Sequence, residues 1–262
     1  MNKLKLILLL LSSIVFYNCD DNNRGFINPF EGTDYEQLAI SDNDSILKFL
    51  NTHYYDAVTD SIKLISSNET SLFEDNNTLE IKDLVENDIK YTLYTYIVDE
   101  GEPSADKGNP SIVDSVFTTY SGIELLNNTI DRDPFDSNTQ IWIGNSIVGW
   151  ANGFTNFRNG NNITNNGPIT YNNTGKGFIF IPSGLAYPSL DFVFGQNDPN
   201  ALPYDRILVF KIELLDFVVD TDHDNDGVPS IQEDANGDGN PRNDFSDPNF
   251  PTRPDYLNPN IK

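Results

Sequence analysis

Alternating apolar and polar positions predict a β-strand over residues 89–98. Ile89, Tyr91 and Leu93 are separated by polar residues, and the apolar positions then change parity at Tyr94. The aromatic and β-branched content favours a strand, and the change of parity indicates a β-bulge within it. Shorter apolar runs predict further strands, at residues 115–120, 140–143, 177–181 and 207–219.

Two segments are predicted to be helical. Residues 42–55 carry apolar side chains with a helical period, and Asp42 or Asp44 is the expected N-cap. A glycine-bounded turn after residue 143 leads into a short helix that starts near residues 147–150. Several strands and a single short helix in this region predict an α+β fold, in which an antiparallel sheet wraps around the helix.

The segments between these elements differ in composition. Residues 57–88 are mixed and are expected to cover one side of the main domain through their apolar side chains, which are Ile62, Leu64, Leu72, Phe73, Leu79 and Ile81. Residues 101–109 are expected to form a loop. Residues 156–176 are rich in Asn, Gly and Thr and predict an inserted loop or hairpin.

Length and composition allow one or two domains and argue against a nucleic-acid partner. The chain has 262 residues, of which 38% are hydrophobic and 21% are charged, and this leaves room for a core between long polar loops. The formal net charge is −24, and a chain this acidic is repelled by phosphate backbones. The acidic balance is more typical of a solvated surface or of cation sites.

The N-terminal residues 1–18 have the pattern of an export signal. Lys3 and Lys5 precede an apolar run over residues 6–16, which is too short to span a bilayer as a stable helix. Cys19 follows and resembles the lipidation cysteine of bacterial lipoproteins. The alternative is an ordinary secreted protein in which Cys19 is incidental.

Acyl chains on Cys19 would anchor the protein to a membrane without a spanning helix. The expected location is therefore the cell envelope, as an outer-membrane lipoprotein that faces the periplasm or the surface. Residues 19–40 are predicted to be a tether. Because Cys19 is the one cysteine and there are two histidines, an intrachain disulfide is excluded and a Cys/His zinc site is not expected.

The composition changes after residue 219 to an acidic segment with the spacing of a calcium loop. Residues 222–233 place oxygen donors at loop positions one, three, five and twelve, a glycine at position six, and a backbone carbonyl at position seven. The predicted ligands are Asp222, Asp224, Asp226, Val228 (through its carbonyl) and Glu233. His223 is expected to be exposed rather than a ligand. The alternative is a solvated acidic tail that binds no metal.

A second run restarts this spacing with Asp234, Asn236 and Asp238, and Asp244 is a candidate to close it because Phe245 occupies the last position. Residues 255–258 resemble the end of a further repeat. Clear flanking helices are missing from the pattern, so the segment resembles the Asp-rich calcium repeats of extracellular proteins more than a helix-loop-helix pair. We expect calcium to order this segment, residues 220–262, as a stabilising cap.

Four runs in the central region together resemble the FKBP-type peptidyl-prolyl cis-trans isomerases. They are Pro134–Ser137, Gly144–Trp150, Phe180–Tyr187 and Ile207–Leu214, and the resemblance covers residues 89–218, about half of the chain. It implies isomerisation of X-Pro bonds in an aromatic pocket, with proline-containing exported polypeptides as partners. It also implies that catalysis needs no metal or cofactor.

The resemblance assigns seven residues to this pocket: Tyr120, Phe135, Asp136, Ile147, Trp150, Tyr187 and Phe210. It implies that Trp150 lies beneath the proline ring as the floor. The Ile147 backbone N–H and the Tyr187 hydroxyl would donate hydrogen bonds to substrate carbonyls.

The remaining pocket residues would form its walls and rim. The resemblance makes Tyr120, Phe135 and Phe210 the walls, and it places Asp136 at the rim, where it orients Tyr120. The residues themselves leave an alternative open, since buried aromatic rings are more often simply core.

Several positions depart from the family pattern. Thr139 stands near an expected aromatic wall residue, Ser146 replaces an apolar residue, and Pro188 replaces a glycine. Phe192, Val193 and Phe194 are candidates to supply replacement pocket surface. These departures favour a rival function, a binding or chaperone module with the same pocket and little catalysis. A second rival is a structural or surface-display protein that acts through its calcium tail.

The expected organisation has five parts. Residues 1–18 are the signal peptide, 19–40 the lipid-anchored tether, 41–88 an N-terminal helical extension, 89–219 the FKBP-like domain, and 220–262 the calcium-binding tail. The expected state is a monomer.

Overall fold

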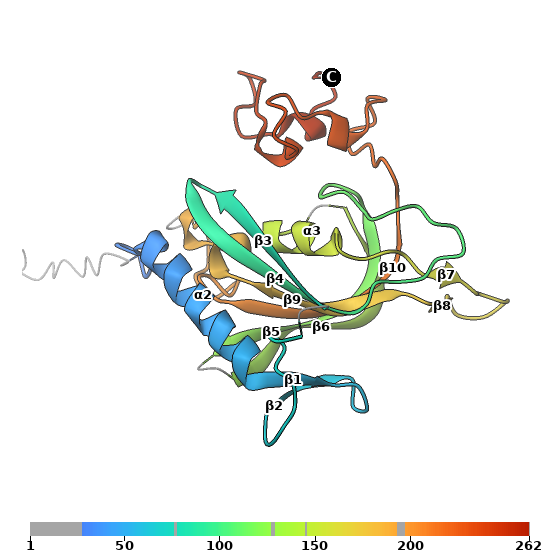
Figure 1. The fold of residues 1–262 in the computed structure, drawn as a ribbon. Helices are drawn as coiled ribbons and strands as arrows, with labels where there is room; N and C mark the ends of the chain where they lie inside the picture. Colours follow the sequence, from blue (N-terminus) through green and yellow to red (C-terminus); the bar gives the residue numbers. More distant parts are fainter. Residues whose placement is uncertain (1–27, 76–77, 127–128, 145, 193–196, 262) are drawn as a thin grey trace, which may run out of the picture.

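In the computed structural model, a six-stranded antiparallel sheet curves around one short helix (Figure 1). The structure describes residues 28–75, 78–126, 129–144, 146–192 and 197–261; the side chains of residues 129–138 and 191 are not described. The strand order is β3-β4-β9-β10-β5-β6. The strands are β3 (Leu79–Glu86), β4 (Ile89–Asp99), β5 (Val116–Leu126), β6 (Thr129–Ile143), β9 (Gly175–Ile181) and β10 (Leu208–Phe217). The predicted α+β fold is confirmed.

The central strands bury both faces, and this is why they appear in the sequence as continuous apolar runs. In β9, Ile179 and Ile181 pack in the core that holds the short helix α3, whereas Phe178 and Phe180 pack in a second core under the long helix α2. The sheet therefore separates two hydrophobic clusters, and α2 and α3 lie on opposite faces of it (Figure 1).

Helix α2 (Tyr35–Thr52) begins seven residues earlier than the periodicity predicts. Asp34 is the N-cap, and its side chain accepts a hydrogen bond from the Gln37 amide at 3.0 Å. The prediction of Asp42 or Asp44 as the N-cap is therefore wrong. Asp42 instead lies inside the helix, where it is buried. The first turns of this helix also fall within the stretch predicted as a tether.

The segment after α2 forms a hairpin, β1 (His53–Asp56) and β2 (Ser61–Leu64), and then the outer strand β3 of the sheet. The expectation that its apolar residues cover one side of the domain is confirmed for Ile62, Leu72, Phe73 and Leu79, which join the α2 cluster. It is wrong for Leu64 and Ile81, which are exposed. Leu64 lies in the separate hairpin and Ile81 in the outer strand β3. Strands in such positions are covered less completely than central strands, so an apolar residue in them need not be buried.

Helix α3 (Val148–Phe154) lies in direct contact with β9 because it carries two glycines one turn apart. A Cβ atom on Gly149 would lie 2.3 Å from Ile181 Cγ2, and one on Gly153 would lie 2.6 Å from Ile179 Cδ1. Both distances are too short for a larger residue. The predicted helix start near residues 147–150 is confirmed, and this contact fixes where Trp150 can lie.

The other predicted strands are confirmed with different bounds. The bulge expected at the change of parity is a wrong prediction, because β4 pairs with β3 without a shift through Leu93 and Tyr94 and buries apolar side chains on both faces. A register shift occurs later, between Ile97 and Asp99. Strands β5 and β6 run longer than their apolar cores suggest. Residues 156–176 contain the small hairpin β7 (Asn161–Asn162) and β8 (Tyr171–Asn172), as one of the two alternatives predicted.

The acidic C-terminal segment folds as short 3-10 turns on the α3 side of the sheet (Figure 1). These turns are η3 (Ser230–Gln232), η4 (Pro241–Asn243) and η5 (Asp255–Leu257). A backbone hydrogen bond joins η4 to η5, since the Asp255 amide donates to the Asp244 carbonyl at 2.9 Å. Within the described residues, the structure has no helix with the length and hydropathy that a bilayer crossing requires.

Candidate functional site

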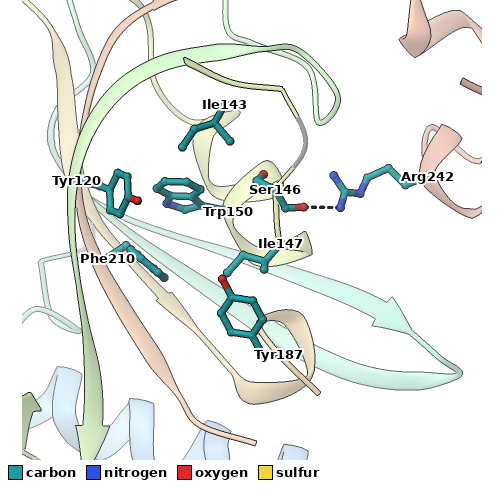
Figure 2. A pocket seen from close by; sticks show the side chains of 8 residues that line it. All are labelled: Tyr120, Ile143, Ser146, Ile147, Trp150, Tyr187, Phe210 and Arg242. Atoms are coloured by element: carbon teal, nitrogen blue, oxygen red, sulfur yellow. Dashed lines mark hydrogen bonds between the residues drawn. The ribbon is translucent and has the colours of Figure 1, made fainter. Parts of the chain in front are cut away.

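A cavity of about 510 Å³ opens beside α3, on the concave side of the sheet (Figure 2). Strands β5, β6 and β10, the first turn of α3, the segment after β9 and the acidic tail all contribute to it. Its lining residues are Tyr120, Ile143, Ser146, Ile147, Trp150, Tyr187, Phe210 and Arg242. The volume is in the range of sites that bind small molecules or a few residues of a peptide.

Trp150 forms the base of the cavity and is held by rings on three sides. The Tyr120 ring stands edge-on to it at 4.8 Å, the Phe210 ring is tilted at 5.2 Å, and Phe154 supports it from the core at 5.4 Å. Gly122 permits the position of Phe210, since a Cβ there would lie 2.2 Å from Phe210 Cε1. The aromatic surface is therefore rigid before any ligand binds.

Three hydrogen-bond donors accompany this apolar surface. The indole N–H of Trp150 is buried without an acceptor among the described residues, which costs about 1–3 kcal/mol. The Ile147 amide also donates to no acceptor in the described part of the chain. Burial raises the pKa of Tyr187, so its phenol stays protonated and can donate. The arrangement suits an apolar group bearing carbonyl oxygens.

Five of the seven pocket residues expected from the sequence line this cavity: Tyr120, Ile147, Trp150, Tyr187 and Phe210. The side chains of Phe135 and Asp136 lie outside the described residues. Their backbones pair with Gly122 and Ser121 of β5, the strand that carries Tyr120.

The replacement surface expected from Phe192 is a wrong prediction. Its ring packs against Phe30 at 5.1 Å and Tyr204 at 5.6 Å, in an aromatic cluster outside the cavity lining. Val193 and Phe194 lie outside the described residues. This cluster packs Phe192 against Phe30, which lies shortly before the start of α2.

Arg242 belongs to the cavity lining although it comes from the acidic tail. Its Nη2 donates to the Ser146 carbonyl at 2.6 Å (Figure 2). No local sequence signal indicates this contact, because it joins two segments far apart in the chain. Ser146, one of the departures from the family pattern, thus contributes its backbone carbonyl to the contact with the tail.

His223 makes a second contact between the tail and the pocket rim. Its Nε2 lies 2.8 Å from the Gly144 carbonyl, and its Nδ1 lies 3.0 Å from Ser230 Oγ. A carbonyl only accepts, so Nε2 carries the proton, and in the neutral ring Nδ1 accepts from the Ser230 hydroxyl. His223 is half-buried rather than fully exposed, because the tail packs against the residues that precede α3.

The acidic loop brings its predicted ligand residues together. One carboxylate oxygen from each of Asp222, Asp224 and Asp226 lies within 4.8 Å of the other two, the one such carboxylate group found among the described residues. Glu233 is 5% exposed, and neither of its carboxylate oxygens has a hydrogen-bond partner among those residues. Burial, and then repulsion from the three aspartates, raises the pKa of Glu233 to about 7.

Val228 lies in the same loop, where its amide donates to Asp226 at 2.8 Å. The second run repeats the backbone contacts of the first, in which Asp222 accepts the amides of Asn225 and Gly227. Asp234 accepts backbone amides from Gly237 and Gly239, and Asp244 accepts the Ala235 amide. Metal ligation by the second run, which includes Asn236 and Asp238, stays a prediction.

No family model and no curated protein sequence matches the chain. Among solved structures, it is similar to a peptidyl-prolyl cis-trans isomerase from Pseudomonas syringae, with 16% identity, a TM-score of 0.39, and coverage of 71% of this chain and 98% of that chain. It is similar to FkpA from Escherichia coli, with 16% identity, a TM-score of 0.34, and coverage of 83% and 82%.

The chain is also similar to the N-terminal domain of FKBP42 from Arabidopsis thaliana, with 16% identity, a TM-score of 0.33, and coverage of 53% and 92%. TM-scores this low establish neither a family nor an activity for this chain. A functional proposal therefore depends on the geometry of the aromatic cavity and on the residues that line it.

Proposed function

We propose that the protein is a peptidyl-prolyl cis-trans isomerase that assists the folding of exported polypeptides. The observation that carries this proposal is the aromatic cavity, in which Tyr120 and Phe210 hold Trp150 at the base. The sequence runs support the same assignment, because three of the four contribute Ile147, Trp150, Tyr187 and Phe210 to that one cavity.

The proposed mechanism is removal of the amide from water followed by distortion. Resonance gives the X-Pro bond its rotation barrier of about 18–20 kcal/mol, and the resonance form is strongly polar. An apolar environment therefore favours the twisted, less polar amide. The proline ring would lie on the Trp150 indole between Tyr120 and Phe210, and strain in the bound peptide contributes on the order of 1–5 kcal/mol.

The donors at the cavity edge would hold the peptide on either side of the rotating bond. The Ile147 amide would bind one substrate carbonyl and the Tyr187 hydroxyl another, each contributing about 0.5–1.5 kcal/mol. Fixing both sides lets rotation occur without release of the peptide. Only donation and burial are required of the protein, so no nucleophile takes part.

The test is a protease-free isomerisation assay on an X-Pro peptide, with calcium present. We expect the parent to accelerate isomerisation and Trp150→Leu to lower kcat/KM by about tenfold or more, which is about 1.4 kcal/mol of lost transition-state stabilisation. The matched control is Trp142→Leu, because Trp142 is 50% exposed on β6 and outside the cavity. We expect it to keep parental activity.

A folded parent that shows no acceleration would refute the isomerase. If it still binds proline peptides in a Trp150-dependent manner, the binding or chaperone module is the correct function. Equal losses in the two tryptophan variants would show that the cavity is not the site.

We further propose that the protein acts in the cell envelope, anchored through lipid on Cys19. Residues 1–27 lie outside the described residues, so this rests on the pattern of the export signal and the cysteine that follows it. Cys19→Ser is expected to move the protein from the membrane fraction to the soluble fraction. Unchanged membrane association in this variant contradicts the anchor.

A further inference from the structure

The tail contains one buried carboxylate that the described protein leaves without a partner. Glu233 is 5% exposed, and both of its oxygens are buried without a hydrogen-bond partner among the described residues. Desolvating a carboxylate without compensation is costly. It closes the twelve-residue loop whose Asp222, Asp224 and Asp226 each bring a carboxylate oxygen within 4.8 Å of the other two. Three gathered carboxylates, with a buried and unpartnered fourth carboxylate in the same loop, call for a cation.

The donor set favours calcium over softer or smaller metals. All four side chains offer carboxylate oxygens, and His223, the nearest nitrogen donor in the sequence, already uses both ring nitrogens for Gly144 and Ser230. Calcium takes 6–8 oxygen ligands in flexible geometry, whereas magnesium retains several waters and zinc favours nitrogen and sulfur. The loop therefore fits calcium best.

We propose that the loop over residues 222–233 binds calcium, and that the bound ion holds the C-terminal tail against the rim of the aromatic cavity. The consequence for catalysis rests on the isomerase proposed above, whereas the ion site and the contact do not. Calcium thus acts on the cavity through the structure of the tail, without touching a substrate.

The contact between the two sites consists of a histidine and an arginine from the tail. His223 lies between two predicted ligands in the sequence, and its ring reaches the Gly144 carbonyl at 2.8 Å. Arg242 reaches the Ser146 carbonyl at 2.6 Å. Both carbonyls belong to residues that precede Ile147, which lines the cavity.

Removing the ion would leave the carboxylates facing one another in a partly buried loop. Their mutual repulsion favours an open loop, and His223 then moves with the ligands on either side of it. Once His223 and Arg242 leave the two carbonyls, the connection before Ile147 loses its outer support. We therefore expect the first turn of α3 to become more mobile when calcium is removed.

Ion binding is tested by titrating calcium into the full chain, purified in detergent and freed of metal, with calorimetric detection. We expect saturable binding that Glu233→Gln weakens at least tenfold. The control is Asp220→Asn, which removes an exposed carboxylate just outside the loop at a φ of 54° that asparagine tolerates. It should bind like the parent. Absence of saturable binding, or equal losses in both variants, overturns the ion site.

The contact with the cavity is tested by hydrogen–deuterium exchange on the same protein. We expect chelation to raise deuterium uptake several-fold at Ile147 to Trp150. We expect Arg242→Met to raise uptake even with calcium bound, and to weaken calcium binding far less than Glu233→Gln does, because coupling between the ion and the contact is reciprocal. Calcium binding with unchanged uptake there overturns the contact. Because neither readout needs isomerase activity, failure of this proposal and failure of the proposed function are distinguishable.

Discussion

Asp42 offers a sharp test of how the N-terminal helix supports the cavity. It lies in the middle of α2 and is 5% exposed. Its Oδ2 accepts two hydrogen bonds from Ser183, from the amide at 2.8 Å and from the hydroxyl at 2.6 Å. Ser183 opens the turn η1 (Ser183–Leu185), and this turn leads to Tyr187 at the cavity. The contact therefore joins α2 to a wall of the pocket.

The Asp42→Ala substitution leaves both Ser183 donors buried without their acceptor. Each unsatisfied group costs about 1–3 kcal/mol, so the loss of folding free energy lies between about 2 and about 6 kcal/mol. Burial also disfavours the carboxylate and raises the pKa of Asp42, which offsets part of that loss. We therefore expect about 2–3 kcal/mol for Asp42→Ala, and about 1 kcal/mol for Asp42→Asn, which keeps one acceptor.

The assay is urea unfolding followed by tryptophan fluorescence at a fixed, saturating calcium concentration. A double-mutant cycle with Ser183→Ala isolates the hydroxyl contact, and we expect a coupling of about 0.5–3 kcal/mol. If Asp42→Ala loses less than about 0.5 kcal/mol, as a typical surface substitution does, the reasoning is refuted. Additive losses across the cycle would likewise show that the hydroxyl contact contributes nothing.

Three further predictions follow from the same geometry. Gly149→Val places a methyl group where Ile181 lies and should cost about 1–3 kcal/mol in urea unfolding; a parental midpoint contradicts direct helix–strand contact. Gly122→Val should displace the Phe210 ring and lower isomerase kcat/KM more than stability; full activity contradicts a wall role. The pKa of Asp42 is higher in the folded state than its ordinary value of 3.8, so near that pH the folded state binds more protons than the unfolded state. The contribution of Asp42 to the free energy of unfolding therefore falls as pH rises above about 4. The difference in free energy of unfolding between the parent and Asp42→Asn should shrink as pH rises above about 4, as measured by urea unfolding at several pH values. A difference that widens would contradict a raised pKa for Asp42.

Local sequence patterns predicted the elements well where burial and periodicity coincide. The runs at residues 89–98 and 177–181 became β4 and β9, because alternation and continuous apolar stretches report the faces that a strand buries. The predicted start of α2 was wrong because aspartate is a favoured N-cap, and Asp42 precedes the residues with the clearest helical period. Only the packing of α2 on the sheet shows that Asp42 is bonded to Ser183.

The sequence alone therefore determined the strands, the short helix, the carboxylate spacing of the tail and the residue types available for an aromatic cavity. These follow from interactions between residues close together in the chain, which leave a periodic or spaced pattern. The tertiary structure alone decided that Arg242 and His223 meet the carbonyls of Ser146 and Gly144, and that Phe192 packs elsewhere. Such contacts join segments far apart in the chain, and their partners are backbone groups that every residue carries, so no sequence pattern marks them.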